Sequence, residues 1–224
     1  MNWFLKLLSS TIGRKLLMAL TGLFLILFLV IHLIGNLQLL KNDGGEAFNV
    51  YAKFMTSNPI IVTISYINYA CILIHAVWAL LLTISNRRAR GSDGYAVVKN
   101  SSPWTSRNMG ILGTLVLIFL VIHLRGFWYE MHWGGIPTVN IDGEDVKNLY
   151  ATVDEAYSTA WYVGVYVFSM LVLAFHLWHG FVSAFQTLGW NHKKYNPLIA
   201  FIGKAFAIIV PALFALIPIW MLLD

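Results

Sequence analysis

Four of the seven histidines of this chain lie within long apolar stretches, where an ionisable side chain is rarely placed without a partner or a task. They are His32, His75, His123 and His176. A neutral imidazole can offer one ring nitrogen to a metal ion while the other donates a hydrogen bond, and it can also relay a proton. The single cysteine, Cys71, excludes an internal disulfide and a Cys-x-x-Cys-His attachment site. The four histidines are therefore candidates for metal binding or proton transfer within a membrane.

The stretches that carry these histidines are long enough to cross a bilayer. Of the 224 residues, 58% are hydrophobic and 11% are charged, whereas about 25% are charged in a typical globular protein. A membrane-spanning helix needs about 20 apolar residues. Apolar runs bounded by polar or turn residues predict five such helices, at residues 15–40, 59–85, 108–131, 158–188 and 198–223. We therefore expect an all-α fold in which residues 1–224 form a single transmembrane bundle.

Basic residues are concentrated on one side of the predicted membrane. The N-terminus and the second and fourth connections contain Lys6, Arg14, Lys15, Arg87, Arg88, Arg90, Lys99, Arg107, Lys193, Lys194 and Lys204. The only basic residues in the first and third connections are Lys41, Lys53 and Lys147. The positive-inside rule places the N-terminus in the cytoplasm. Because the net charge of +5 is explained by topology, nucleic acid is not an expected partner.

With this orientation the four histidines fall at two depths. Each lies about 16 to 18 residues from the start of its helix, which corresponds to about 25 Å of helical rise. The helices of His32 and His123 start on the cytoplasmic side, so these two form an outer pair. The helices of His75 and His176 start outside, so these two form an inner pair.

A local repeat supports the outer pair. The segment FLVIHLIG, from Phe28 to Gly35, recurs as FLVIHLRG, from Phe119 to Gly126, with seven of eight positions identical. Two parallel helices thus present the same histidine surface at the same height, as ligation of one flat macrocycle from both faces requires. The two glycines would leave room for the edges of such a ring, and Gly180, one turn after the histidine of the fourth helix, offers similar space.

The two pairs predict two non-covalently bound b haems, each with two imidazole ligands. A bis-imidazole iron has no open position, so this arrangement suits electron transfer. A single intramembrane histidine more often makes a hydrogen bond between helices than it binds a metal. Zinc and copper sites usually gather more ligands at one point, and two depth-matched pairs favour haem.

Two further residues are expected near the haems. His179 lies one turn from His176 and competes with it as the inner ligand. We expect His176 to be the ligand and His179 to hydrogen-bond a haem propionate or a neighbouring helix. Arg125, beside the outer histidine of the third helix, could pair with a propionate, since a guanidinium binds a carboxylate through two hydrogen bonds. The alternative for Arg125 is extension towards the membrane interface.

The order of the spans and histidines resembles the di-haem cytochrome b membrane anchor of succinate:quinone oxidoreductases, in its five-helix, single-chain form called the b558 family. The resemblance extends over nearly the whole chain. Its most specific stretches are HLIGNLQ from His32 to Gln38, HLWHG from His176 to Gly180, and SAFQTLG from Ser183 to Gly189. It implies that the inner pair ligates the proximal haem and the outer pair the distal haem.

The resemblance also implies partners, a cellular location and a task. It implies a complex II, acting as succinate dehydrogenase or fumarate reductase in a respiratory chain of the bacterial cytoplasmic (inner) membrane. In it, a flavoprotein and an iron–sulfur subunit bind the cytoplasmic face. This chain would carry electrons between the iron–sulfur subunit and a membrane quinone, which the resemblance suggests is menaquinone. The chain has neither a Gly-x-Gly-x-x-Gly flavin motif nor a set of cysteine ligands, so it would not act on succinate by itself.

Reduction of a quinone takes up protons, so its site needs a titratable group near the outer haem. Family members place an acidic residue in the first external connection, where this chain has Asp43 and Glu46. The resemblance favours Glu46 as the quinone-site acid. The other interpretation is that both carboxylates only solvate the connection.

Three other functions are compatible with parts of the pattern. The cytochrome b subunit of a membrane hydrogenase or formate dehydrogenase also holds two b haems, but the order of one histidine per helix fits it less well. A transporter with a histidine proton relay would be colourless and leaves the repeat unexplained. A structural anchor without cofactors would still bind the soluble subunits.

Overall fold

The structure is a computed structural model that describes residues 2–3, 6–7, 10–90 and 103–224. Within these residues, five helical stretches are long and apolar enough to cross a membrane: Thr11–Leu40, Pro59–Ala89, Met109–Trp133, Ala160–Thr187 and Asn196–Leu223. The predicted all-α bundle of five transmembrane helices is confirmed, and the protein is a multi-pass membrane protein. Of the bases counted above, Lys99 lies outside the described residues.

The spans are formed by α2 (Thr11–Asn36) with the 3-10 turn η1 (Leu37–Leu40), α4 (Pro59–Arg90), α6 (Met109–His123), α9 (Ala160–Thr187) and α10 (Asn196–Leu223). The third span continues beyond α6 through a π-helical turn, η2 (Leu124–Trp128), into α7 (Tyr129–Trp133). Shorter elements connect the spans: α3 (Glu46–Ser57), α5 (Trp104–Arg107), β1 (Thr138–Ile141), β2 (Glu144–Lys147) and α8 (Leu149–Tyr157).

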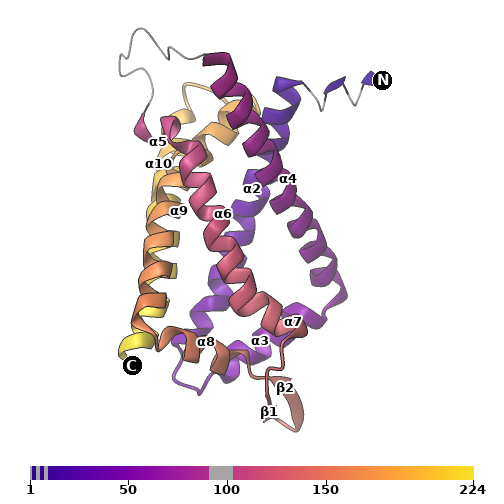
Figure 1. Ribbon diagram of the computed structural model, residues 1–224, viewed down its shortest axis with the longest axis vertical. Coiled ribbons are helices and arrows are strands. Elements are labelled where there is room, and N and C mark those ends of the chain that lie inside the picture. Colours follow the sequence, from indigo (N-terminus) through magenta and orange to yellow (C-terminus); the bar gives the residue numbers. More distant parts are fainter. Residues whose placement is uncertain (1, 4–5, 8–9, 91–102) are drawn as a thin grey trace.

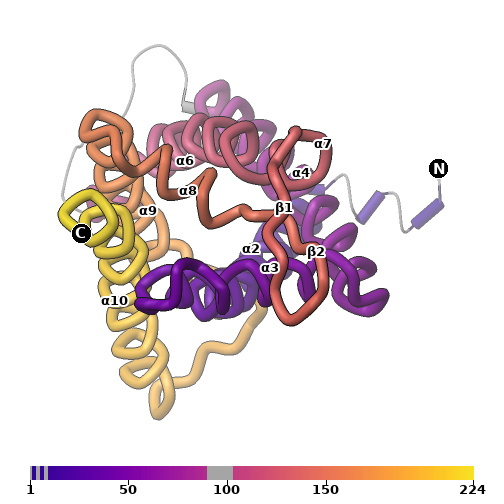
Figure 2. The backbone as a smooth tube through the Cα atoms, turned by 90° about the horizontal axis from the view of Figure 1, so that it is seen from below, coloured from indigo at the N-terminus to yellow at the C-terminus, as the bar shows by residue number. Residues whose placement is uncertain are grey.

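The spans run alternately up and down. The start of α2, the end of α4, α5 and the α9–α10 connection lie at one end of the bundle, which we call the basic end (Figure 1). The four helices that carry the histidines contact one another in a ring, in the order α2, α4, α6, α9, and α10 packs against α9 and α2 (Figure 2). The basic end therefore collects the connections that the charge pattern assigns to the cytoplasm.

Polar side chains begin two of the spans. The Oγ atom of Ser10 accepts a hydrogen bond from the Gly13 amide at 3.0 Å, and the Oδ1 atom of Asn58 accepts one from the Ile60 amide at 3.0 Å. Such caps satisfy amides that have no partner within the helix. They mark the residues at which these two helices begin.

The opposite end of the bundle, which we call the capped end, is covered by α3, α8 and the β1–β2 hairpin (Figure 1). We call these three elements together the cap. The sequence predicts only connections there. The two strands are antiparallel, and their tight turn has positive φ angles at Asp142 (52°) and Gly143 (84°), as two-residue hairpin turns often require.

An ion pair between Lys53 of α3 and Glu144 of β2 joins the two connections. The Lys53 ammonium lowers the pKa of the Glu144 carboxyl, so the pair persists at neutral pH and is lost as the carboxylate protonates in acid.

One buried asparagine links the two connections at the capped end. The side chain of Asn49 is only 2% exposed. Its Oδ1 atom accepts a hydrogen bond from the Tyr150 amide at 2.9 Å, and its Nδ2 atom donates one to Asn148 Oδ1 at 3.0 Å. The start of α3 adds to this contact, because a Cβ atom on Gly45 would lie 2.1 Å from the Tyr150 ring. The positive φ of 85° at Gly45 also favours glycine.

Replacing Asn49 by Ala should destabilise the capped end by about 1–3 kcal/mol, the usual effect of leaving a buried polar group without its partner. The thermal unfolding of the full chain in detergent measures the effect. Val50→Ala is the matched control, because Val50 is the next residue of α3 and is 46% exposed. Equal unfolding temperatures for the two variants would show that the asparagine does not hold the cap.

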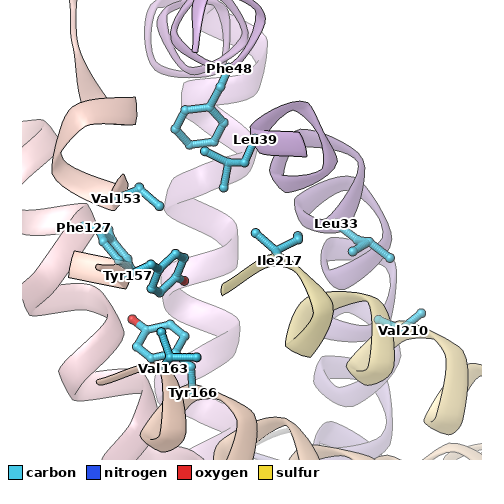
Figure 3. Close-up of a cluster of buried hydrophobic side chains, with 10 residues drawn as sticks. All are labelled: Leu33, Leu39, Phe48, Phe127, Val153, Tyr157, Val163, Tyr166, Val210 and Ile217. Atoms are coloured by element: carbon cyan, nitrogen blue, oxygen red, sulfur yellow. The ribbon is translucent and has the colours of Figure 1, made fainter. Parts of the chain in front are cut away.

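A cluster of mutually packed buried side chains lies towards the capped end. It combines residues of α2, η1, η2, α9 and α10 with residues of α3 and α8 (Figure 3). Its members are Leu33, Leu39, Phe48, Phe127, Val153, Tyr157, Val163, Tyr166, Val210 and Ile217. The helices α3 and α8 therefore share one buried core with the halves of the spans nearest the capped end.

Candidate functional site

The outer histidines, His32 of α2 and His123 of α6, face each other across the bundle. Their ring centroids are 5.7 Å apart and the ring planes are almost perpendicular, at 88°. Phe28 packs on His32 at 5.1 Å and Phe119 on His123 at 5.7 Å, so the repeated segments provide an equivalent aromatic neighbour for each ring. The structure thus brings together the two histidines that the repeat pairs.

The inner histidines also meet. His75 of α4 lies with its ring centroid 6.4 Å from that of His176 of α9, at an interplanar angle of 66°. The ring that contacts His75 is that of His176, the candidate preferred over His179 in the sequence analysis. Four different helices therefore contribute one ring each, in two pairs.

The two pairs lie at different levels of the bundle. The His75 ring packs beside Gly22 of α2, where a Cβ atom would lie 3.3 Å from its Cε1, and the His176 ring packs beside Gly113 of α6, at 3.7 Å. Each glycine lies ten residues before the outer histidine of the same helix. Ten helical residues correspond to about 15 Å. The inner pair is therefore about 15 Å nearer the basic end than the outer pair.

The spacing within each pair fits a haem iron between the rings. With a metal–nitrogen distance of about 2 Å on each side, two imidazoles that bind one ion from opposite faces have their centroids about 6 Å apart. The two measured separations, 5.7 Å and 6.4 Å, lie on either side of this value. Within the described parts of the chain, no group of three or more His, Cys, Asp or Glu side chains could hold a metal ion. Each pair thus offers two ligands, the number that a haem iron takes from a protein when both axial positions are filled.

The ring nitrogens differ in their hydrogen-bond partners. The Nδ1 atom of His75 lies 3.1 Å from Thr21 Oγ1, and the Nδ1 atom of His123 lies 3.4 Å from Tyr166 Oη. His176 Nδ1 is buried and has no partner among the described residues. Thr21 and Tyr166 were not predicted from the sequence, because each lies on another helix and no local pattern relates it to its histidine.

Three glycines were expected to leave room for haem edges, and the structure gives each a side chain as its neighbour. A Cβ atom on Gly35 would lie 2.3 Å from Tyr51 Cε1, and one on Gly126 would lie 2.8 Å from Tyr162 Oη. On Gly180, a Cβ atom would lie 3.6 Å from the methyl carbon of Met109. The first two glycines thus permit close packing of tyrosines near the outer pair, and the role of all three beside a haem stays a prediction.

Arg125 makes its contacts at the surface of the third span. Its guanidinium donates a hydrogen bond to the Glu130 carboxylate and lies 4.6 Å from the centre of the Tyr129 ring. The Arg125 side chain is 67% exposed. These contacts agree with extension towards the interface, whereas pairing of Arg125 with a propionate stays a prediction, as does the propionate or interhelical contact of His179.

The two carboxylates of the first external connection have different surroundings. The Asp43 carboxylate accepts hydrogen bonds from the Gly45 and Ala47 amides, at 3.0 Å and 3.2 Å, and so caps the start of α3. Glu46 is exposed, and it lines a polar cavity of about 240 Å³ between α3 and the hairpin. The cavity is lined by Asp43, Gly44, Glu46, Asn49, Val139, Asn140, Ile141, Asp142 and Asn148. Glu46 is thus the more available of the two carboxylates for proton transfer.

Comparison with known proteins does not add to this picture. No family model, curated protein or solved structure matches the chain. A function for the protein therefore has to be inferred from its paired histidines, its membrane topology and its surface groups.

Proposed function

We propose that this chain is the membrane anchor and electron-transfer subunit of a succinate:quinone oxidoreductase. In this role it carries electrons through two b haems between an iron–sulfur subunit and a membrane quinone. The family resemblance suggests menaquinone as the quinone. One observation carries the proposal. Four helices contribute one histidine each, and these histidines face each other in two pairs at two levels of the bundle. A single pair would fit many metal sites, but two stacked pairs fit a carrier that spans the bilayer.

The residues of this chain would divide the work as follows. His75 and His176 hold the inner haem, and His32 and His123 hold the outer one. Haem b, when bound between these histidines, would supply a one-electron carrier. Phe28 and Phe119 pack on the rings of the outer pair and would shield the haem held there from water.

The charge distribution supports a cytoplasmic partner at the basic end. Lys15, Lys193 and Lys194 are exposed there, and by the positive-inside rule this end faces the cytoplasm. The flavoprotein and iron–sulfur subunits of complex II would dock on this face, in the cytoplasmic membrane of a bacterium. The capped end would face outward and carry the quinone-site acid, Glu46.

The haem content of the purified full chain tests the proposal directly. The chain is expressed in bacterial membranes, purified in detergent and analysed by the pyridine haemochrome assay. Two b haems per chain are expected, and one or none would contradict the pairing. A folded but colourless chain would instead favour a histidine proton relay.

Replacing Glu46 by Gln should slow quinone turnover by roughly 10²–10⁴-fold, the usual contribution of a positioned acid or base, and leave both haem spectra unchanged. Turnover is measured with a soluble menaquinone analogue and the complete complex. Asp142→Asn is the matched control, because Asp142 lines the same cavity and asparagine also tolerates its positive φ. If both variants turn over quinone at the unmodified rate, Glu46 only solvates the connection.

A further inference from the structure

Two buried hydroxyl groups lie against ring nitrogens of the paired histidines. Thr21 of α2 is 7% exposed and its Oγ1 atom lies 3.1 Å from Nδ1 of His75 on α4. Tyr166 of α9 is 4% exposed and its Oη atom lies 3.4 Å from Nδ1 of His123 on α6. Each pair therefore contains one histidine whose Nδ1 atom has a hydroxyl partner on a neighbouring helix.

The direction of the hydrogen bond between Thr21 and His75 depends on where the Thr21 hydroxyl donates its own proton. The Thr21 hydroxyl has a single proton and lies 2.7 Å from the Leu17 carbonyl oxygen, which can only accept. If the hydroxyl donates to Leu17, it can only accept from His75, whose Nδ1 atom must then carry the proton. A neutral imidazole protonated on Nδ1 has its free lone pair on Nε2. With its own proton given to Leu17, Thr21 favours the form of His75 that can bind a metal through Nε2. The Met18 backbone also forms a hydrogen bond with the His75 ring.

Tyr166 can do the same for His123. Its Oη atom also lies 3.3 Å from Tyr162 Oη, so it has an acceptor for its own proton. When Tyr166 donates to Tyr162, it accepts from His123 Nδ1, and the Nε2 atom of His123 is left free. If Tyr166 instead donated to His123 Nδ1, the proton of the neutral imidazole would lie on Nε2, and that atom could not bind iron. Ligation through Nε2 therefore requires that Tyr166 accept the hydrogen bond from His123.

Equivalent positions on α2 and α6 show why His176 lacks such a partner. Gly22 and Gly113 are separated by the same interval as the outer histidines and lie against the inner histidines in equivalent ways. The residue before Gly22 is Thr21, whereas the residue before Gly113 is Leu112, which has no hydroxyl. His176 Nδ1 is accordingly buried without a hydrogen-bond partner among the residues described. The inner pair thus combines one anchored and one unanchored imidazole.

We propose that Thr21 and Tyr166 are positioning residues that hold His75 and His123 with Nδ1 protonated and Nε2 directed to the iron. This inference rests on the proposed haem-binding function and goes beyond it. An acceptor on Nδ1–H fixes the orientation of a metal-bound histidine and increases its basicity. A more basic ligand stabilises the oxidised iron, so each hydroxyl lowers the reduction potential of its own haem. Each pair receives this effect from one imidazole only, because neither His32 nor His176 has a hydroxyl against its Nδ1 atom among the residues described.

Single substitutions in the full chain test the inference, with haem content and the potential of each haem as readouts. Thr21→Val keeps the shape of the side chain and removes the hydroxyl; it should raise the inner potential only and weaken inner haem binding roughly 10-fold or more. Thr21→Ser should restore both values. Tyr166→Phe should raise the outer potential only, and Leu112→Thr, which supplies the missing hydroxyl, should lower the inner one.

The outcomes separate the two proposals. An unmodified chain without haem contradicts the haem-binding function itself. Two haems whose potentials are unchanged in Thr21→Val and Tyr166→Phe contradict only the positioning role, as do equal shifts of both haems in either variant. If Thr21→Val does not fold, Tyr166→Phe, which keeps the buried ring, decides the question for the outer pair, and Leu112→Thr decides it for the inner pair.

Discussion

Replacing His123 by Ala is expected to leave one b haem in a chain that otherwise holds two. The substitution removes one of the two imidazoles of the outer pair, whose rings face each other at 5.7 Å. The inner pair lies about 15 Å away along the helices and shares no ring with it. The pyridine haemochrome assay measures the stoichiometry, and the visible spectrum identifies the haem that remains.

Alanine substitutions at other histidines provide the controls for this experiment. His32→Ala should leave the same haem as His123→Ala, whereas His75→Ala should leave the other one. His132→Ala is the matched control, because its ring hydrogen-bonds the Trp128 carbonyl at 2.8 Å outside both pairs, and it should retain two haems. If His32→Ala and His123→Ala left different haems, the two histidines would not share one iron.

The second large effect is expected for His176→Ala, which should remove the inner haem and lower succinate-to-quinone turnover of the assembled complex by about 100-fold or more. Without that haem, no carrier remains in the inner half of a bilayer core about 30 Å thick. Haem content and turnover are measured on the same preparation.

His179→Ala is the control that distinguishes neighbouring histidines of α9. The His176 ring packs against His75 at 6.4 Å, and a residue three positions along a helix points in a different direction. We therefore expect His179→Ala to retain both haems. Loss of the inner haem in His179→Ala, with two haems kept in His176→Ala, would reverse the assignment of the ligand.

The spans could be predicted closely because membrane crossing depends on local composition. An unbroken apolar run is sufficient to predict a helix, and the predicted range 59–85 became Pro59–Ala89 in the structure. The cap was not predicted. Its helices and hairpin are short, and Asn49 holds them through partners about 100 residues away in the sequence. Such contacts leave no periodic signal in the chain.

For the candidate site, the sequence alone determined which histidines share a depth, because helical rise is constant and charge fixes the direction of each span. The repeat around His32 and His123 added a common surface. Only the tertiary structure decided which side chains meet the ring nitrogens. Thr21 reaches His75, and Leu112 leaves His176 without a partner. The physical reason is that depth depends on position along one helix, whereas a hydrogen bond between helices depends on the rotation and packing of both.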